Sequence, residues 1–172
     1  MNPRIHAEFV PFDPAQVALV AGWPQSAQEA GWWCGAGPFP VPAQTVADWQ
    51  QDEDVRAHML IADGAVAAYG ELWVDDGEAG VELARIIVAP GARRQGLGRA
   101  LVRGLLSEAA GVGYPDIFIR VHPDNIVALN CYRGTGFVDV DTALAQQWNV
   151  PQPVSYAWLH HAGAAPGSST PA

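Results

Sequence analysis

Positive charge in this chain gathers around one short segment, Arg93-Arg94-Gln95-Gly96-Leu97-Gly98. The sequence has no lysine, and four of its nine cationic residues lie in or just after that segment: Arg93, Arg94, Arg99 and Arg103. The two glycines allow ligand oxygens to approach the backbone where a helix is expected to begin. A helix N-terminus presents unpaired N–H groups and about half a positive charge. A solvated helix face is the plain alternative, but the glycines favour a phosphate-binding site.

Two common phosphate-binding motifs do not fit this segment. A nucleotide-triphosphate loop needs a Lys-Ser/Thr pair to hold phosphate and magnesium, and this chain contains no lysine. The dinucleotide fingerprint follows the first strand of a parallel unit, whereas this segment follows three strand-like stretches joined by short turns. Phosphoryl transfer and dinucleotide chemistry are therefore disfavoured.

Asn125 and Tyr132 are the second set of residues whose types and spacing suit chemistry. On a helix, residues seven positions apart share one face and lie about 10 Å apart, and here the small Ala128 lies between them. A slender, extended ligand fits along such a face. Each residue also has an ordinary structural explanation, since Asn commonly caps a helix and a buried Tyr is commonly a core residue.

The elements that must position these residues follow from the spacing of apolar residues. Strand-like alternation occurs at residues 4–11, 58–62, 65–74, 81–88, 116–121, 137–140 and 154–159. Helical patterns occur at residues 14–20, 26–30, 43–50, 97–111 and 126–133. Asp-Gly turns join the three central strands into an antiparallel meander. The prediction is an α+β fold with one domain over residues 1–161 and a disordered tail at 162–172.

Composition limits the class of protein. A chain of 172 residues that is 49% hydrophobic suits one compact core, and its net charge of −9 disfavours nonspecific binding to nucleic acid. No leader-like segment and no apolar stretch of about 18–20 residues is present, so we expect a soluble, cytoplasmic protein that makes no membrane contact. Cys34 and Cys131 are expected to be free thiols, and His160-His161 lacks a third ligand, so no metal site is predicted.

Two stretches together resemble the motifs of the GCN5-related N-acetyltransferases, the GNAT family. In the first, which runs from Val88 to Gly98, the pattern Arg93-x-x-Gly96-x-Gly98 resembles the family's acyl-CoA-binding motif. In the second, an Asn opens a helix, a Tyr follows two turns later, and Gly136-Phe137 starts the next strand. The resemblance covers residues 59–137 and implies a central mixed, mostly antiparallel sheet flanked by helices. The implied order of elements is β-α-α-β-β-β-α-β-α-β-β.

The resemblance also implies roles for individual residues. The pyrophosphate of coenzyme A would lie on the backbone amides of the glycine loop, with the arginine side chains free to reach phosphates. The implied donor-binding residues are Ile86, Ile87 and Val88 for the pantetheine arm, Arg93, Arg94, Gln95, Gly96, Leu97, Gly98 and Arg99 for the phosphates, and Asn125 for the arm. Tyr132 would lie near the sulfur and protonate the departing thiolate.

The acceptor amine arrives mostly as an ammonium ion, so a proton acceptor is needed. Glu82 is the first candidate because it lies where some members of the family place a basic glutamate. Glu71, on the preceding strand, is the second and His122 is the third. Solvated strand carboxylates and a turn histidine are the plain alternatives, and a chain of water molecules is a further one.

The Trp-rich stretch at residues 22–49 occupies the region that in this family builds one wall of the acceptor pocket. Trp32, Trp33 and Phe39 would then face an aromatic or cationic acceptor, although core packing explains them at least as well. Cys131 lies about 100° around the helix from Tyr132, so we interpret it as a core residue rather than a nucleophile.

The predicted function is direct transfer of an acetyl or other small acyl group from acetyl-CoA (acyl-CoA), as a cosubstrate, to a primary amine. The alternative is a noncatalytic acyl-CoA-binding sensor with the same fold. The acceptor is a small-molecule amine or a protein or peptide amine, and the acidic composition favours a cationic one. A homodimer is compatible with the sequence.

Overall fold

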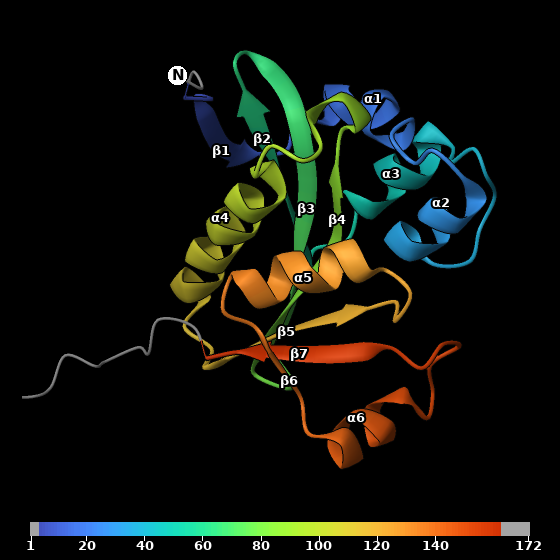
Figure 1. The fold of residues 1–172 in the computed structure, drawn as a ribbon, viewed down its shortest axis with the longest axis vertical. Helices are drawn as coiled ribbons and strands as arrows, with labels where there is room; N and C mark the ends of the chain where they lie inside the picture. Colours follow the sequence, from blue (N-terminus) through green and yellow to red (C-terminus); the bar gives the residue numbers. More distant parts are fainter. Residues whose placement is uncertain (1–3, 163–172) are drawn as a thin grey trace, which may run out of the picture.

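The computed structural model describes residues 4–162, which form a seven-stranded sheet in the order β1-β2-β3-β4-β5-β7-β6, with helices on both faces (Figure 1). The strands are β1 (Ala7–Pro11), β2 (Val55–Ala62), β3 (Ala65–Asp75), β4 (Gly80–Val88), β5 (Asp116–Val121), β6 (Val138–Asp139) and β7 (Ala157–His161). The helices are α1 (Val17–Ala21), α2 (Ala27–Cys34), α3 (Ala43–Trp49), α4 (Leu97–Val112), α5 (Ile126–Gly134) and α6 (Thr142–Asn149), with 3-10 turns at Pro14–Gln16 and Pro90–Ala92. From residue 163 on, the predicted tail lies outside the described residues.

Strand pairing confirms the predicted mixed, mostly antiparallel sheet. Strands β1 to β4 form the antiparallel meander expected from the turns, and β7 pairs antiparallel with both β5 and β6. The pair β4 and β5 is parallel and short, because only Gly80–Leu83 of β4 pairs with Asp116–Ile119 of β5. Since β4 continues to Val88, its last five residues, from Ala84 on, have no strand partner on that side.

Two hydrophobic clusters pack the helices onto opposite faces of the sheet. Helices α4 and α5 cover one face, where Leu101 and Leu105 of α4 join Leu72 and Leu83 of the sheet. Gly70 allows this close packing, because a Cβ there would lie 2.9 Å from Leu105 Cδ1. On the other face α1, α2 and α3 form a second cluster with residues of β2, β3 and β4. The leucine spacing predicted for the helix at residues 97–111 therefore gives α4 its buried side.

The structure contains two more helices than the predicted order of elements. Helices α1, α2 and α3 lie between β1 and β2, as the three helical patterns there predict, whereas the order implied by the resemblance has two. Helix α6 lies between β6 and β7. Helix α6 fully buries no residue, but Leu144 and Trp148 lie four positions apart on it and Trp148 packs edge-on against Phe118 and Trp158. Asp141 caps its first turn. The last strand is β7 at Ala157–His161 rather than residues 154–159. Within residues 4–162, no helix combines the length and apolarity needed to cross a membrane.

Candidate active site

The free edge of β4 is the first component of the site. Beyond Leu83, β4 still pairs with β3 along one edge, but its other edge has no pairing with β5. An unpaired strand edge presents N–H and C=O groups that can bind an extended ligand as an added strand. In sheets with parallel strands, ligands bind beyond the carboxyl ends of strands that separate. Ile86, Ile87 and Val88, the residues predicted to hold the pantetheine arm, all lie on this edge.

A bulge interrupts β4 where it leaves β5. The register between β3 and β4 shifts between Tyr69 and Glu71, and Arg85 adopts a positive φ of 47°. A non-glycine residue seldom adopts such a φ, so the surroundings must hold it in place. The indole Nε1 of Trp33 does so by donating a hydrogen bond of 2.8 Å to the Arg85 carbonyl oxygen.

The glycine loop leads into the N-terminus of α4. Gly96 precedes the helix with a φ of 78°, a left-handed conformation that favours glycine. The helix is 16 residues long, so its first N–H groups form an anion-binding site of the predicted kind. A Cβ at Gly98 would lie 3.5 Å from Val88 Cγ2 and 3.6 Å from Cys131 Sγ. The end of β4, the start of α4 and the middle of α5 therefore meet at Gly98.

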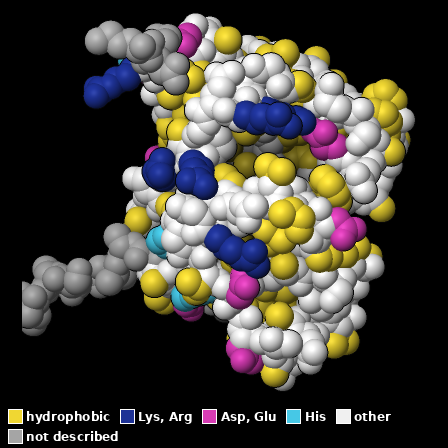
Figure 2. Space-filling view, in the orientation of Figure 1, with side chains coloured by type: hydrophobic (Ala, Val, Ile, Leu, Met, Phe, Trp, Pro, Cys, Tyr) yellow, Lys and Arg dark blue, Asp and Glu magenta, His cyan; other side chains and the backbone are white. Residues whose placement is uncertain are grey.

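The arginines of the loop differ in how free their side chains are. Arg93 forms an ion pair with Glu29 of α2, and its Nε donates to the Val88 carbonyl oxygen at 3.1 Å. The expectation that Arg93 is free to reach a phosphate is therefore wrong for its side chain, because Glu29, 64 residues earlier, holds it. Arg94 and Arg99 are exposed. Figure 2 shows arginine side chains grouped on the face that α4 and α5 cover, beside a hollow in the surface.

Helix α5 carries Asn125 and Tyr132 as predicted. Asn125 Oδ1 accepts the N–H of Ala128 at 3.3 Å, so the side chain caps the helix while its amide N–H groups stay available. The Tyr132 ring is only 7% exposed and packs edge-on against Phe137. Burial raises the pKa of Tyr132, so its hydroxyl stays protonated at neutral pH. Within residues 4–162 this hydroxyl has no hydrogen-bond partner.

Cys131, next to Tyr132, is half-buried and free. Burial raises the pKa of its thiol, and Arg99 and Arg103 oppose that effect without cancelling it. A protonated thiol is a weak nucleophile. The structure therefore supports the interpretation of Cys131 as a packing residue.

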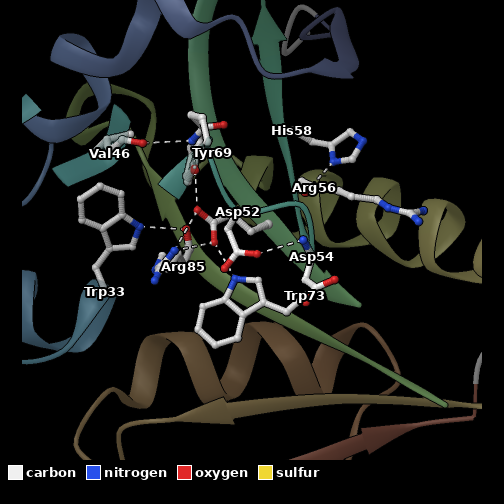
Figure 3. Close-up of polar contacts among 11 residues, drawn as sticks. Trp33, Val46, Asp52, Asp54, Arg56, His58, Tyr69, Trp73 and Arg85 are labelled. Atoms are coloured by element: carbon white, nitrogen blue, oxygen red, sulfur yellow. Dashed lines mark hydrogen bonds and ion pairs between the residues drawn. The ribbon is translucent and has the colours of Figure 1, made fainter. Parts of the chain in front are cut away.

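Glu71 lies at the centre of a buried polar network with Tyr69, Trp73 and Arg85, and Figure 3 shows these three partner side chains pointing toward one another. Its side chain is 0% exposed and accepts hydrogen bonds from the Tyr69 hydroxyl at 2.5 Å and the Trp73 indole at 2.7 Å. The Arg85 guanidinium completes the network with an ion pair of 3.0 Å. Burial raises the pKa of Glu71, whereas Arg85 and the hydrogen bonds lower it to a smaller extent. Its oxygens are thus occupied and shielded, which does not suit the role of a proton acceptor for an incoming amine.

Glu82 is also paired, but it is closer to solvent. Arg120 Nε and Nη2 donate to its two oxygens at 2.6 and 3.2 Å, and the Glu82 side chain is 19% exposed. Burial raises its pKa and Arg120 lowers it, with burial the larger effect. The third candidate, His122, accepts the N–H of Asp124 at Nδ1, so that nitrogen is not free to take a proton. Of the three candidates, Glu82 best suits a base that acts through water.

The aromatic residues predicted to form an acceptor wall have different environments. Trp33 is buried and packs against Trp49 at 5.2 Å, as a core residue does. Trp32 lies 6.1 Å from the His122 ring, which connects α2 with the end of β5. Phe39 is 43% exposed. Only Trp32 therefore reaches across toward the separating strands.

Sequence reasoning missed the two arginines that neutralise these glutamates, Arg85 and Arg120. Each is the one cation of its strand, β4 or β5, which was the signal available. Within residues 4–162, no three His, Cys, Asp or Glu side chains lie together as metal ligands.

A glycine-rich helix N-terminus next to a strand edge that lacks a partner is an arrangement suited to an extended, phosphate-bearing ligand. The family follows from comparison with known proteins: the model of the acetyltransferase (GNAT) family matches residues 25–137. The chain belongs to this family. The fold and the family predicted from the sequence are both confirmed.

Similar proteins have different acceptors in their names. Ribosomal protein bS18-alanine N-acetyltransferase of Escherichia coli K12 is 34% identical over 102 residues, which cover 59% of this chain and 67% of that protein. Mycothiol acetyltransferase of a Nocardioides species is 35% identical over 112 residues, 58% of this chain but only 38% of that protein. The chain thus matches well under half the length of the mycothiol enzyme.

Solved structures share the fold at low sequence identity. Spermidine N-acetyltransferase from Vibrio cholerae, in complex with CoA and spermine, aligns with a TM-score of 0.65 at 14% identity, over 90% of this chain and 92% of that chain. This likeness establishes the fold and leaves the acceptor open.

Proposed function

We propose that this protein transfers an acetyl or other small acyl group from acyl-CoA to a primary amine. The observation that carries the proposal is the meeting of three elements at Gly98. There the end of β4, represented by Val88, and Cys131 of α5 lie within van der Waals reach of the first turn of α4. A single extended donor can therefore contact an anion-binding helix end, an open strand edge and the helix that bears Tyr132.

In this proposal the backbone amides of residues 94–99 bind the pyrophosphate. Arg94 and Arg99 are exposed and add charge at the same helix end, whereas Arg93 positions the loop by holding Glu29 and the Val88 carbonyl. The pantetheine arm pairs with β4 at Ile86–Val88, and an N–H group of that edge stabilises the oxyanion that forms on the thioester carbonyl. The free amide N–H groups of Asn125 donate to the arm.

The chemical steps then proceed by direct attack. The ammonium form of the acceptor gives a proton through water to Glu82, and the neutral nitrogen attacks the thioester carbon. The nitrogen of the tetrahedral intermediate loses its second proton to water as the intermediate collapses. The carbon–sulfur bond breaks, and the thiolate takes a proton from the Tyr132 hydroxyl. Solvent then reprotonates Tyr132, and Glu82 returns its proton to solvent, so neither residue is changed after a full turnover.

Release of free thiol from acetyl-CoA, measured with a panel of primary amines, tests the proposal. We expect amine-dependent thiol release well above the rate without amine, with an N-acetylated product detected by mass spectrometry. Binding of acetyl-CoA without thiol release from any amine would instead support the noncatalytic sensor. Absence of acetyl-CoA binding would contradict both.

A further inference from the structure

Aromatic rings and arginines alternate along the sheet face opposite α4. The Arg85 guanidinium carbon lies 4.0 Å from the centre of the Trp49 ring and 4.8 Å from that of Trp73. The Arg120 guanidinium carbon lies 5.5 Å from Trp73 and 5.3 Å from Trp158. The row therefore runs from Trp49 of α3 through Arg85 of β4, Trp73 of β3 and Arg120 of β5 to Trp158 of β7.

The carboxylates beneath this row are already used. Glu71 is 0% exposed and accepts hydrogen bonds from Tyr69, Trp73 and Arg85. Both oxygens of Glu82 accept from Arg120. A cationic group on the acceptor, such as the second amine of a polyamine, would therefore find neither glutamate free to pair with it.

The ring faces offer little more to a cation. Positive charge binds over an aromatic ring within about 6 Å of its centre. Arg85 and Arg120 already hold such positions over all three tryptophans of the row. A ligand cation would have to displace a guanidinium or lie next to one, and like charges repel. The row thus disfavours a second positive charge on the acceptor, although the net charge of the whole chain is −9.

Donor groups of Arg85 remain available. Its Nη1 binds Glu71, whereas Nε and Nη2 have no partner among the described residues. Within residues 4–162 no buried side-chain nitrogen or oxygen lacks a hydrogen-bond partner, so both nitrogens reach solvent. Arg85 is the second residue after Leu83, where β4 separates from β5, and its side chain lies on the face opposite α4.

We infer that the acceptor is an amine that also carries a carboxylate, such as a free amino acid, and that Arg85 binds this carboxylate through Nε and Nη2. The inference rests on the proposed acyl transfer and adds the class of acceptor. A guanidinium fork matches the geometry of a carboxylate, and the flanking indoles of Trp49 and Trp73 limit its movement. Arg85 is therefore a specificity-determining residue.

The experiment compares amino acids with their carboxamides and with spermidine as acceptors, by kcat/KM from thiol release. We expect each acid to exceed its amide by about 10-fold to 100-fold, the range of a charge-assisted hydrogen-bonded pair. The variant Glu71→Gln/Arg85→Gln removes both charges together, so no unpaired buried charge remains. It should lower the acid-to-amide ratio to about one while acetyl-CoA affinity is kept.

Two further variants keep the test decisive. Glu82→Gln/Arg120→Gln removes the neighbouring ion pair, so it should slow turnover but preserve the acid-to-amide ratio. Arg85→Lys keeps the charge and removes the fork, and it should reduce the ratio partly even if the double variant does not fold.

A binding measurement separates this inference from the proposed function. With coenzyme A present, N-acetylamino acids should raise the melting temperature more than their amides, and only when Arg85 is intact. If no amine is turned over but this difference is seen, acyl transfer fails and the carboxylate site stands. Turnover of amides or of spermidine as fast as acids would overturn the inference.

Discussion

Replacing Tyr132 by Phe separates chemistry from binding within one helix. The hydroxyl has no hydrogen-bond partner in the described part of the chain, so its removal leaves no donor or acceptor unsatisfied. The ring, which is 7% exposed and lies 6.3 Å from Phe137 between ring centres, keeps its volume and its packing. We therefore expect the free energy of unfolding to change by less than about 1 kcal/mol.

The effect on turnover should be much larger. A general acid contributes about 10²-fold to 10⁴-fold to a rate. A thiolate with a pKa of about 8–9 can leave without full protonation, so we expect a loss of kcat near 10²-fold, about 2.7 kcal/mol in the barrier. Burial raises the pKa of Tyr132, so the acid form persists on the alkaline side. The loss should therefore be the same at pH 7 and pH 9.

The assay is steady-state thiol release together with calorimetric measurement of acetyl-CoA affinity. Tyr114→Phe is the matched control, because its hydroxyl bonds Asp76 on an exposed part of the surface. Full activity of the Tyr132→Phe variant would show that Tyr132 only packs. Loss of acetyl-CoA affinity in parallel with kcat would make it a donor contact and leave the proton donor to be found.

Three more outcomes are expected. The Gly98→Asp variant should fold, because a Cβ at Gly98 meets only ordinary contacts. It should lose acetyl-CoA binding in calorimetry, because the new carboxylate lies where the phosphate of the donor must lie. The control Gly37→Asp, with open space around it, should bind acetyl-CoA normally. Burial raises the pKa of Glu82, so kcat/KM should fall as the solution is acidified through a pKa above the ordinary carboxyl value. This acidic fall in kcat/KM should be missing in the Glu82→Gln variant, and an unchanged fall would exclude Glu82 as the base. Acetyl-CoA at about 100 times its dissociation constant should stabilise the fold by about 2.7 kcal/mol, and a melting curve that does not move at millimolar donor would remove the donor site altogether.

Local patterns in the sequence determined the backbone of the donor site. The leucine spacing of α4, the position of the glycines at its start and the Asn125 cap each depend on residues within a turn or two. Such features follow from hydrogen bonds and sterics of neighbouring residues, so the sequence was enough to predict them. Helix α6 is the exception, because its one pair of large apolar residues at helical spacing, Leu144 and Trp148, is too short a repeat to indicate a helix.

Only the tertiary structure decided which side chains are free to act. Arg93 meets Glu29 across 64 positions, and Arg120 meets Glu82 across 38. These pairings depend on strand register, on the bulge at Arg85 and on how α2 packs over the sheet, none of which a local pattern encodes. An ionisable side chain becomes a ligand, a base or a neutralised partner according to the charges that the fold brings within a few ångströms of it. For that reason the sequence could propose both Glu82 and Glu71 as bases, in that order, but only the fold shows that Glu71 is fully buried and that each carboxylate is paired with an arginine.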